Sequence, residues 1–287
     1  MAQLFRRMTV CGVGLIGGSL AMIARREGLV GEIVGLGRTR KNLDIALERR
    51  IADRVTQDPA EAARDADLVV LAVPVRTIPE AFAAMAPHLA PNAVVTDVGS
   101  VKGWVVRELE PLLGPAMALA AAHPVAGKET TGAVAADPGL FKDQRVIITP
   151  SARSTPPALD KVEALWRATG ARVERMAPDV HDRILALASH LPQFVASALG
   201  AALADEQVAG KLAAGFGAAG LRDTTRIAAS SAEMWRDIGL TNREAIVSAL
   251  KLYRATFDEF LAALERGDGA ALEALFERGR RIRERLK

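Results

Sequence analysis

The stretch MTVCGVGLIGGSLAMIAR, residues 8–25, decides the fold of this chain. It opens with an apolar run typical of a buried strand, and an apolar helix is expected from Gly18 onward. Between them Gly12, Gly14 and Gly17 complete the pattern G-x-G-x-x-G. After a strand and before a helix, these glycines provide a tight turn, room for a pyrophosphate and close helix packing. We therefore predict a dinucleotide site formed by Gly12, Gly14, Leu15, Ile16 and Gly17.

Strand and helix continue to alternate up to about residue 177. The predicted strands are Met8–Val13, Glu32–Gly37, Asp67–Val73, Ala93–Val98, Met117–Ala122, Arg145–Thr149 and Arg172–Met176. The predicted helices between them include Gly18–Glu27, Arg40–Arg50, Ala60–Arg64 and Pro156–Thr169. Several strands are continuous apolar runs, such as LVVLAV at 68–73, which is expected when both faces of a sheet are covered. The pattern predicts an α/β domain over residues 1–177 with a doubly wound parallel sheet.

From Pro178 the strand-like runs disappear, and stretches rich in Ala, Leu, Arg and Glu continue to the end. Asp179 is predicted to cap the first helix, and His181 is interpreted as a residue of the helix start. Two later helices are expected at Glu244–Glu265 and Ala270–Leu286. We predict an all-α domain over residues 178–287. Its architecture also predicts a homodimer formed through this domain.

Composition restricts the classes of function. Lys and Arg number 37 against 34 Asp and Glu, and aromatic residues make up 4% of the 287 residues. This balance disfavours a nucleic-acid partner. The single cysteine, Cys11, excludes an internal disulfide and a cysteine-rich zinc site, and no metal is expected. No uninterrupted apolar stretch approaches about 18 residues, so we predict a cytoplasmic protein without a membrane partner.

The end of the second predicted strand bears on the choice of cofactor. NAD-binding proteins usually place an acidic residue about 20 positions after the glycine pattern, where it accepts a hydrogen bond from the ribose 2′-hydroxyl. Here that position is Gly37, followed by Arg38, Thr39 and Arg40. Guanidinium groups bind a 2′-phosphate, whereas a carboxylate would repel it. The sequence therefore favours NADP and leaves NAD possible.

Further candidate residues follow later strands, where ligands of open α/β sheets bind. Val73 and Pro74 close the third strand and are expected to form a wall for the adenosine half of the cofactor. Ser100 and Lys102 follow the fourth strand and would bring a hydroxyl and an ammonium near the nicotinamide. His123 comes directly after the fifth strand. Core packing explains a histidine there poorly, so we predict a catalytic or ligand-binding role.

Two polar clusters interrupt the apolar helical half. His190 and Gln193 flank a proline that is expected to break the helix and free backbone groups. A binding site and a kinked helix with a satisfied histidine are equally compatible with this cluster. Arg222 and Arg226 suit the bidentate capture of a carboxylate, and a purely structural pair of Arg222 with Asp223 is the alternative.

Together these motifs resemble the prephenate/arogenate dehydrogenase family of tyrosine biosynthesis. The matching motifs are GVGLIGGS (12–19), DVGSVK (97–102), HPVAGKE (123–129), SHLP (189–192) and GLRDTTRIA (220–228). They span nearly the whole chain in the family's order. The resemblance implies a Rossmann-like domain followed by a helical dimerisation domain, in agreement with the fold predicted from the residues.

The resemblance also implies an activity, the NAD(P)-dependent oxidative decarboxylation of prephenate, arogenate or both. In the family's pattern His123 would accept the proton of the substrate's C4 hydroxyl as hydride leaves, and an imidazole suits this at neutral pH. Ser100 would orient that hydroxyl. Lys128 and Glu129 would lie on the substrate side, the latter as a gating or network residue.

The helical half would supply the rest of the implied substrate site. His190 and Gln193 would line the pocket, and Arg226 would pair with a substrate carboxylate, with Arg222 as the alternative. Many prephenate-preferring members read SHLPH, whereas this chain has Gln193 in the last place, which leaves arogenate, or both substrates, open.

Two other functions are compatible with a dinucleotide domain. Hydride-transfer enzymes of the β-hydroxyacid or imine type usually carry a catalytic lysine in the first long helix of the second domain. Here the helical half has no lysine before Lys211, which disfavours that class. A non-catalytic NADP-binding regulator would bind the cofactor without turnover and would have no use for His123.

Overall fold

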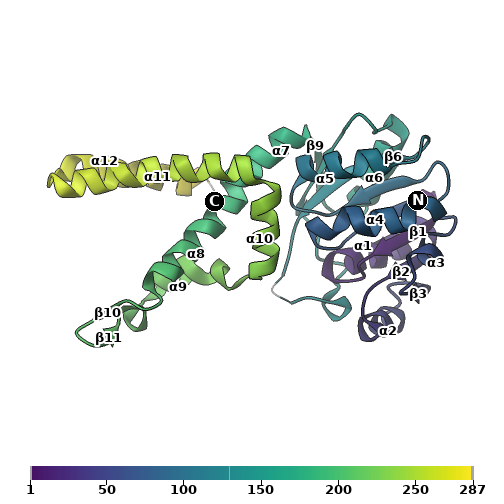
Figure 1. Ribbon diagram of the computed structural model, residues 1–287, viewed down its shortest axis with the longest axis horizontal. Helices are drawn as coiled ribbons and strands as arrows, with labels where there is room; N and C mark the ends of the chain where they lie inside the picture. Colours follow the sequence, from purple (N-terminus) through teal and green to yellow (C-terminus); the bar gives the residue numbers. More distant parts are fainter. Residues whose placement is uncertain (1, 129, 286–287) are drawn as a thin grey trace.

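The computed structural model describes residues 2–128 and 130–285, so the predicted site residue Glu129 lies outside the described residues. The N-terminal half is built on a parallel sheet. Its strands are β1 (Phe5–Cys11), β2 (Val30–Leu36), β3 (Arg54–Thr56), β4 (Leu68–Leu71), β5 (Val94–Asp97) and β6 (Ala118–Leu119). Their order is β3-β2-β1-β4-β5-β6 (Figure 1). The predicted doubly wound sheet is confirmed, and its order reverses between β1 and β4, where such sheets bind ligands.

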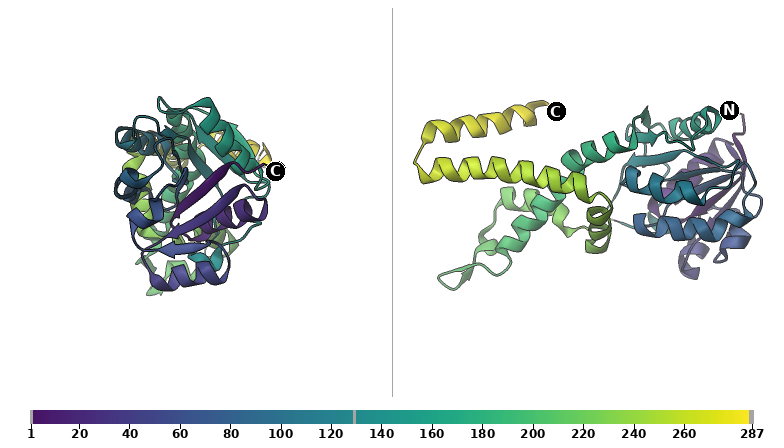
Figure 2. Two further views of the ribbon diagram at one scale, coloured as in Figure 1. Left: turned by 90° about the vertical axis from the view of Figure 1, so that its right-hand side faces the viewer. Right: turned by 45° about the horizontal axis from the view of Figure 1, so that its top comes forward.

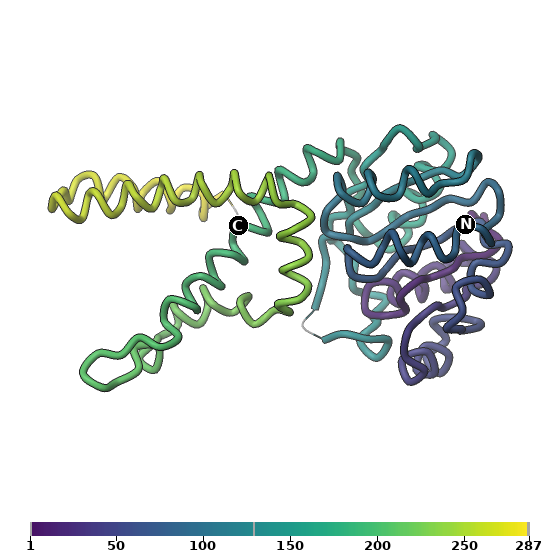
Figure 3. The backbone as a smooth tube through the Cα atoms, in the orientation of Figure 1, coloured from purple at the N-terminus to yellow at the C-terminus, as the bar shows by residue number. Residues whose placement is uncertain are grey.

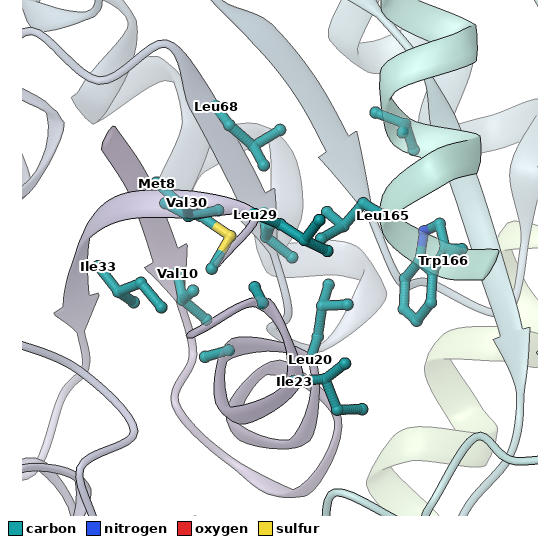
Figure 4. Close-up of a cluster of buried hydrophobic side chains, with 14 of the residues drawn as sticks. Met8, Val10, Leu20, Ile23, Leu29, Val30, Ile33, Leu68, Leu165 and Trp166 are labelled. Carbon is teal, nitrogen blue, oxygen red and sulfur yellow. The ribbon is translucent and has the colours of Figure 1, made fainter. Parts of the chain in front are cut away.

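Helices cover both faces of this sheet. They are α1 (Leu15–Arg26), α2 (Arg40–Glu48), α3 (Pro59–Ala63), α4 (Ile78–Met85), α5 (Lys102–Leu109) and α6 (Pro156–Arg167), with 3₁₀ turns η1 (Val75–Thr77), η2 (Ala86–His88), η3 (Glu110–Leu112) and η4 (Ala133–Ala135). Strand β4 shows why its sequence is continuously apolar. Leu68 and Val70 point into the core that contains Leu20 and Trp166 (Figure 4), whereas Val69 and Leu71 point into a second core on the opposite face.

A second, smaller sheet carries His123 and corrects one prediction. It contains β7 (Ala121–Val125), β8 (Arg145–Thr149) and β9 (Arg172–Arg175), with β7 antiparallel to β8. The single strand predicted at Met117–Ala122 is therefore divided between β6 and β7. His123 lies inside β7, opposite Ile147, and not after the carboxyl end of a strand of the parallel sheet. The sequence could not reveal this break, because Ala118–Ala122 lie in one buried, apolar run.

The C-terminal half is helical, as predicted. It contains α7 (Pro178–Leu185), the π-helical turn η5 (Ala186–His190), α8 (Leu191–Leu203), η6 (Ala213–Phe216), α9 (Ala219–Thr225), η7 (Arg226–Ala229), α10 (Ala232–Thr241), α11 (Arg243–Glu265) and α12 (Gly269–Arg285). Two details differ from the predictions. Ala177, not Asp179, is the N-cap of α7, because Pro178 takes the first helical position. A short hairpin of β10 (Gln207–Val208) and β11 (Lys211–Leu212) interrupts the helices.

The helical half extends away from the sheet domain as a long arm (Figures 1 and 2). It has two projecting parts: one contains α8, α9 and the β10–β11 hairpin, and the other is the antiparallel pair α11 and α12. Phe260 of α11 packs against Phe276 of α12, with ring centroids 5.3 Å apart. Large apolar side chains of this helix pair stay exposed, among them Leu252, Phe257 and Leu264. The arm therefore leaves apolar surface uncovered in the single chain.

The helical run Pro178–Leu203 is long and apolar enough, by length and composition alone, to cross a membrane. Asp182, one of its charged residues, is nevertheless bound by the N-terminal half, because the backbone N–H groups of Lys102 and Gly103 donate to its carboxylate at 2.7 and 2.8 Å. The run thus forms the joint between the two halves, visible as the continuous tube that leaves the sheet domain in Figure 3.

Candidate active site

The glycine turn between β1 and α1 has the geometry that the sequence predicts. Gly12 has a φ of +98°, and a Cβ atom there would lie 2.2 Å from the Ala72 carbonyl oxygen. A Cβ atom on Gly17 would lie 2.3 Å from the Gly12 carbonyl oxygen. Gly14 differs, since a Cβ atom there would meet no heavy atom of the described residues within 4 Å. The turn is closed on its protein side and open where a pyrophosphate would approach.

The start of α1 adds free donors to this turn. Leu15 and Ile16 are the first residues of the helix, its N-cap Gly14 provides no side-chain cap, and no acidic residue occupies the first turn. The first N–H groups and the positive end of the helix dipole are thus available to an anion. Val73 lies beside Gly12 and Pro74 follows it at the surface. These residues fit a dinucleotide.

The three residues predicted to select the cofactor lie together at the start of α2. Arg38, Thr39 and Arg40 are exposed, and the side chain of Thr39, the N-cap, makes no capping hydrogen bond. Arg40 pairs with Asp44 at 2.8 Å. The guanidinium of Arg38 has no hydrogen-bond or ion-pair partner among the residues that the structure describes, so of the two arginines it is the freer to bind a phosphate.

A buried chain of hydrogen bonds starts at His123. The Nδ1 atom of His123 lies 2.8 Å from Nε2 of His181, and Nδ1 of His181 lies 2.8 Å from Oδ1 of Asp182. His123 comes from β7, whereas the other two residues come from α7. The chain therefore connects the two halves of the molecule and ends on the carboxylate that caps α5.

The chemistry of these groups determines where each proton lies. A carboxylate only accepts hydrogen bonds, so Nδ1 of His181 must donate to Asp182. Nε2 of the neutral His181 then accepts, and the donor that it faces is Nδ1–H of His123. The remaining nitrogen of His123, Nε2, carries a lone pair and no proton. His123 is thus held in the tautomer that can accept a proton at Nε2.

A buried ion pair fixes the backbone beside His123. Lys102 and Asp97 are both fully buried and form a salt bridge. The Lys102 ammonium also donates to the Ala122 carbonyl oxygen at 2.8 Å, and the Ala122 N–H donates to Asp97 at 3.2 Å. The backbone N–H and carbonyl groups of Ala122, on the edge of β7 that faces β5, therefore have their hydrogen-bond partners in this ion pair. The sequence predicts the Lys102 ammonium near the nicotinamide; in the structure this ammonium is buried and bound to Asp97 and to the Ala122 carbonyl oxygen.

Burial keeps the imidazoles of this region neutral. Loss of solvation lowers the pKa of His123 well below its ordinary value of 6.5, and the neighbouring His181 and Lys102 act in the same direction. Burial also lowers the pKa of His181, against the effect of its hydrogen bond to Asp182. Both rings are then uncharged at neutral pH, as the tautomer assignment requires.

His190 and Gln193, the polar residues that flank Pro192, are also buried. His190 ends the π-helical turn η5, a local distortion often found at functional sites. Its Nδ1 atom lies 3.2 Å from the amide nitrogen of Asn242, which donates, so the Nε2 atom of His190 carries the proton. Burial lowers its pKa to about 4. The edge of its ring packs against Trp235, with centroids 5.8 Å apart.

The remaining candidate residues range from exposed to buried. Arg226 begins η7 and is exposed, and its guanidinium has no ion-pair partner among the described residues. Arg222 reaches only the Gly217 carbonyl oxygen, at 3.4 Å. Lys128 pairs with Asp137 at 2.6 Å. Gln193 is buried and lies 3.4 Å from the Ser197 hydroxyl, and Ser100 is half-buried between β5 and α5.

Comparison with known proteins decides the family. Residues 20–175 match the nucleotide-binding domain of prephenate dehydrogenase, and residues 177–278 match the prephenate dehydrogenase dimerization domain. The chain belongs to the prephenate dehydrogenase family. The cyclohexadienyl dehydrogenase of Zymomonas mobilis is 34% identical over 99% of this chain and 97% of its own length.

Solved structures of prephenate dehydrogenases share the whole architecture. The Aquifex aeolicus prephenate dehydrogenase in complex with hydroxyphenyl propionate and NAD⁺ has a TM-score of 0.92 and 31% identity, over 98% of both chains. The arogenate dehydrogenase of Synechocystis has a TM-score of 0.85 and 29% identity, over 98% of this chain and all of that one. The fold predicted for this prephenate dehydrogenase family member, a Rossmann-like domain followed by a helical domain, is confirmed.

Sequence reasoning missed two residues of the site in this family member. His181 was assigned to the helix start, yet it is fully buried and joins His123 to Asp182. Asp182 was not singled out, although it caps α5 from another domain. A signal for both was present, since two adjacent polar residues in a run as apolar as 178–203 need partners when buried. Their partner across the domain interface could not be read from the sequence.

Proposed function

We propose that this chain catalyses the oxidative decarboxylation of prephenate, arogenate or both, with a nicotinamide dinucleotide as oxidant. The observation that carries the proposal is the buried chain from His123 through His181 to Asp182, which leaves one imidazole lone pair free. A base held in this way beside a dinucleotide-binding domain suits the oxidation of a hydroxyl-bearing carbon. The family to which the chain belongs catalyses this reaction class.

In the proposed reaction Nε2 of His123 accepts the proton of the substrate's C4 hydroxyl. The bound nicotinamide supplies the hydride acceptor for the hydrogen on C4. The bond from C1 to the ring carboxylate then breaks and CO₂ leaves. The electron pair of the broken bond moves into the ring and completes its aromatic system. His123 returns the proton to the ring oxygen, so the product is a phenol and the base is regenerated. Ser100 is proposed to orient the C4 hydroxyl.

The helical half is proposed to hold the substrate's acidic groups. Arg226 is exposed and without an ion-pair partner among the described residues, and a guanidinium binds a carboxylate through two parallel hydrogen bonds. Arg222 is the alternative. His190 presents an Nε2–H donor, because its other nitrogen accepts from Asn242. Gln193 is proposed to line the same pocket, and its amide in place of a histidine leaves arogenate open as a substrate.

We propose NADP as the preferred cofactor. No carboxylate follows β2, and Arg38 is free to bind a 2′-phosphate. Gly12, Gly14, Leu15, Ile16 and Gly17 would hold the pyrophosphate, and Arg38, Thr39 and Arg40 the 2′-phosphate, with Val73 and Pro74 beside the adenosine. The Aquifex aeolicus enzyme was solved with NAD⁺, so the preference needs a direct measurement.

We also propose that residues 1–177 and 178–287 are the two domains and that two chains associate through the second. The matched C-terminal family is a dimerization domain, and α11 and α12 leave Leu252, Phe257 and Leu264 exposed. A second copy would remove this apolar surface from water. A cytoplasmic location remains a prediction from sequence.

The decisive experiment measures formation of the reduced nicotinamide with prephenate and with arogenate, each with NADP and with NAD. Turnover in at least one combination, with CO₂ released in equal amount, is the expected result. Folded protein that reduces neither cofactor with either substrate would leave a non-catalytic NADP-binding regulator as the better reading. A higher kcat/KM with NAD than with NADP would overturn the role given to Arg38.

A further inference from the structure

The residues that follow the HPVAGKE motif are bound by side-chain hydrogen bonds to α1 and to the region of α2. We define the clasped segment as residues 130–137, which contain the turn η4 and end at Asp137. Its hydrogen-bond partners on α1 and α2 are the side chains of Ser19, Asn42 and Arg49. None of these three residues belongs to the proposed cofactor or substrate contacts.

Arg49 makes the most extensive of these contacts. It follows the last residue of α2, and its guanidinium donates to the carbonyl oxygens of Ala133, Val134 and Ala136 at 2.5, 2.9 and 2.9 Å. No carboxylate pairs with it among the described residues. The Ala133 carbonyl oxygen also accepts from the Ala136 N–H at 3.2 Å within this short turn, and a cation is favourable beside carbonyl oxygens at the C-terminal end of such a turn. Arg49 is thus committed to the clasped segment.

Asn42 connects the clasped segment to the glycine turn. Its Oδ1 atom accepts from the Ala133 N–H at 2.7 Å, and its Nδ2 atom donates to the Val13 carbonyl oxygen at 3.4 Å. Val13 stands between Gly12 and Gly14, where the pyrophosphate would approach. A single side chain therefore touches both the turn that binds the cofactor and the segment beyond the catalytic strand.

Helix α1 completes the attachment. The Ser19 hydroxyl, which is fully buried, accepts from the Asp137 N–H at 2.8 Å. A Cβ atom on Gly18 would lie 2.9 Å from the Ala136 Cβ atom, so the segment packs directly on the helix whose N-terminus faces the cofactor. Asp137 in turn pairs with Lys128, which belongs to the same HPVAGKE motif as His123.

We infer that Asn42 and Arg49 are positioning residues that couple the cofactor site to the substrate site. The inference rests on the proposed function, since it assigns Lys128 and His123 to the substrate side. A displacement of the glycine turn on cofactor binding is transmitted through Asn42 to Ala133, while Arg49 keeps the clasped segment rigid. Bound cofactor then favours the arrangement that binds substrate, and by linkage bound substrate tightens the cofactor equally.

The test measures this coupling by equilibrium binding, without turnover. The dissociation constant of hydroxyphenyl propionate is determined with and without saturating cofactor, in the full-length chain and in its Asn42→Ala and Arg49→Met variants. Allosteric coupling between two sites is commonly about 5–150-fold. The expected result is tighter binding in the presence of cofactor for the unmodified chain, and a coupling reduced at least about fivefold in each variant.

Arg50→Met is the matched control, because Arg50 is adjacent and exposed, and its side chain makes no hydrogen bond or ion pair with the described residues. It should leave the coupling unchanged. Arg49→Lys keeps the charge but lacks the planar fork, and serves if Arg49→Met does not fold. Equal coupling in all folded variants, or no coupling in the unmodified chain, would overturn the inference.

Hydrogen exchange separates this inference from the proposed function. Cofactor alone should slow amide exchange across the clasped segment in the unmodified chain, and Asn42→Ala should abolish that effect. This readout needs no substrate. A chain that shows the exchange effect yet oxidises neither prephenate nor arogenate would refute the proposed function alone, whereas an active chain whose exchange is the same in every variant would refute the coupling alone.

Discussion

Two groups of ionisable residues in this molecule differ in burial and in hydrogen bonding. One is the polar network at the joint of the two halves, and the other is the arginine cluster of α9 and η7. In the network, His123, His181 and Asp182 are buried and hydrogen-bonded to one another across the interface. In the cluster, Arg222 and Arg226 are exposed, and Arg222 has only one long contact, to a carbonyl oxygen. The network is fixed before substrate arrives, whereas the cluster still has its hydrogen-bond donors free.

This difference indicates which region acts on the chemical step of the proposed reaction and which acts on substrate affinity. Preorganised groups act mainly on the rate of the chemical step, and groups that gain partners on binding act mainly on substrate affinity. Variants of the network should therefore lower kcat, and variants of the cluster should raise KM. The following experiments test this division, from the largest expected effect to the smallest.

The largest effect is expected for His123→Asn, which removes the base. Asparagine can keep a hydrogen bond to His181 but cannot accept a proton, so kcat should fall about 10²–10⁴-fold, as general-base catalysis contributes. Steady-state rates with saturating cofactor measure it. His88→Asn is the control, since His88 is an exposed residue of η2, and it should have normal rates. Near-normal turnover by His123→Asn would assign the base to another residue.

Asp182→Asn should have the next largest effect. The carboxylate accepts hydrogen bonds from His181 and from two N–H groups of α5. The asparagine side chain has an NH₂ group in place of one carboxylate oxygen, and this group would face one of these N–H donors. We expect a kcat about 10²-fold lower, less than the roughly 10⁴-fold lost when a wrong tautomer affects the base directly. Asp179→Asn is the matched control, because Asp179 lies one turn earlier, exposed, and pairs only with Arg183. Equal kcat in both variants would contradict a role of Asp182 in fixing the tautomers of His181 and His123.

The two regions also differ in how far the sequence predicts them. The glycine turn, the cations after β2 and the two-domain fold follow from local patterns, because each depends on neighbours in the chain. The network does not, since His123 and His181 are 58 positions apart and meet only when α7 packs against β7. The sequence also did not reveal that Lys102 is fully buried in an ion pair with Asp97, which lies on the strand before it.

Arg226→Ala should act on affinity. A hydrogen bond to a charged group contributes about 1.5–3 kcal/mol, which corresponds to a KM raised about 10–100-fold with kcat changed little. Arg226→Lys should lie between, because lysine keeps the charge without the bidentate fork. Arg222→Ala is compared in parallel. A larger rise of KM in Arg222→Ala would exchange the two roles, and an unchanged KM in both would remove the cluster from the substrate site.

The smallest effect is a loss of stability in acid, which we expect from the buried histidines of the network and from His190, and not from the cluster. Burial lowers the pKa of His190 from 6.5 to about 4, so between these values the unfolded chain binds a proton that the folded chain does not. Stability is therefore complete above pH 6.5 and decreases as the pH falls toward 4, by about 2 kcal/mol between pH 7 and pH 5 for this histidine. The buried His123 and His181 act in the same direction.

Urea unfolding at the two pH values measures this loss. Tryptophan fluorescence follows it, and Trp235, which packs against His190, contributes to this signal together with the other two tryptophans. His190→Gln should retain part of the hydrogen bonding and reduce the loss, because glutamine does not titrate. Arg226→Ala should show the full loss, since it leaves the buried histidines unchanged. Equal stability of the unmodified chain at pH 7 and pH 5 would mean that the buried histidines can bind protons in the folded state. The neutral tautomers assigned to His181 and His123 would then be wrong.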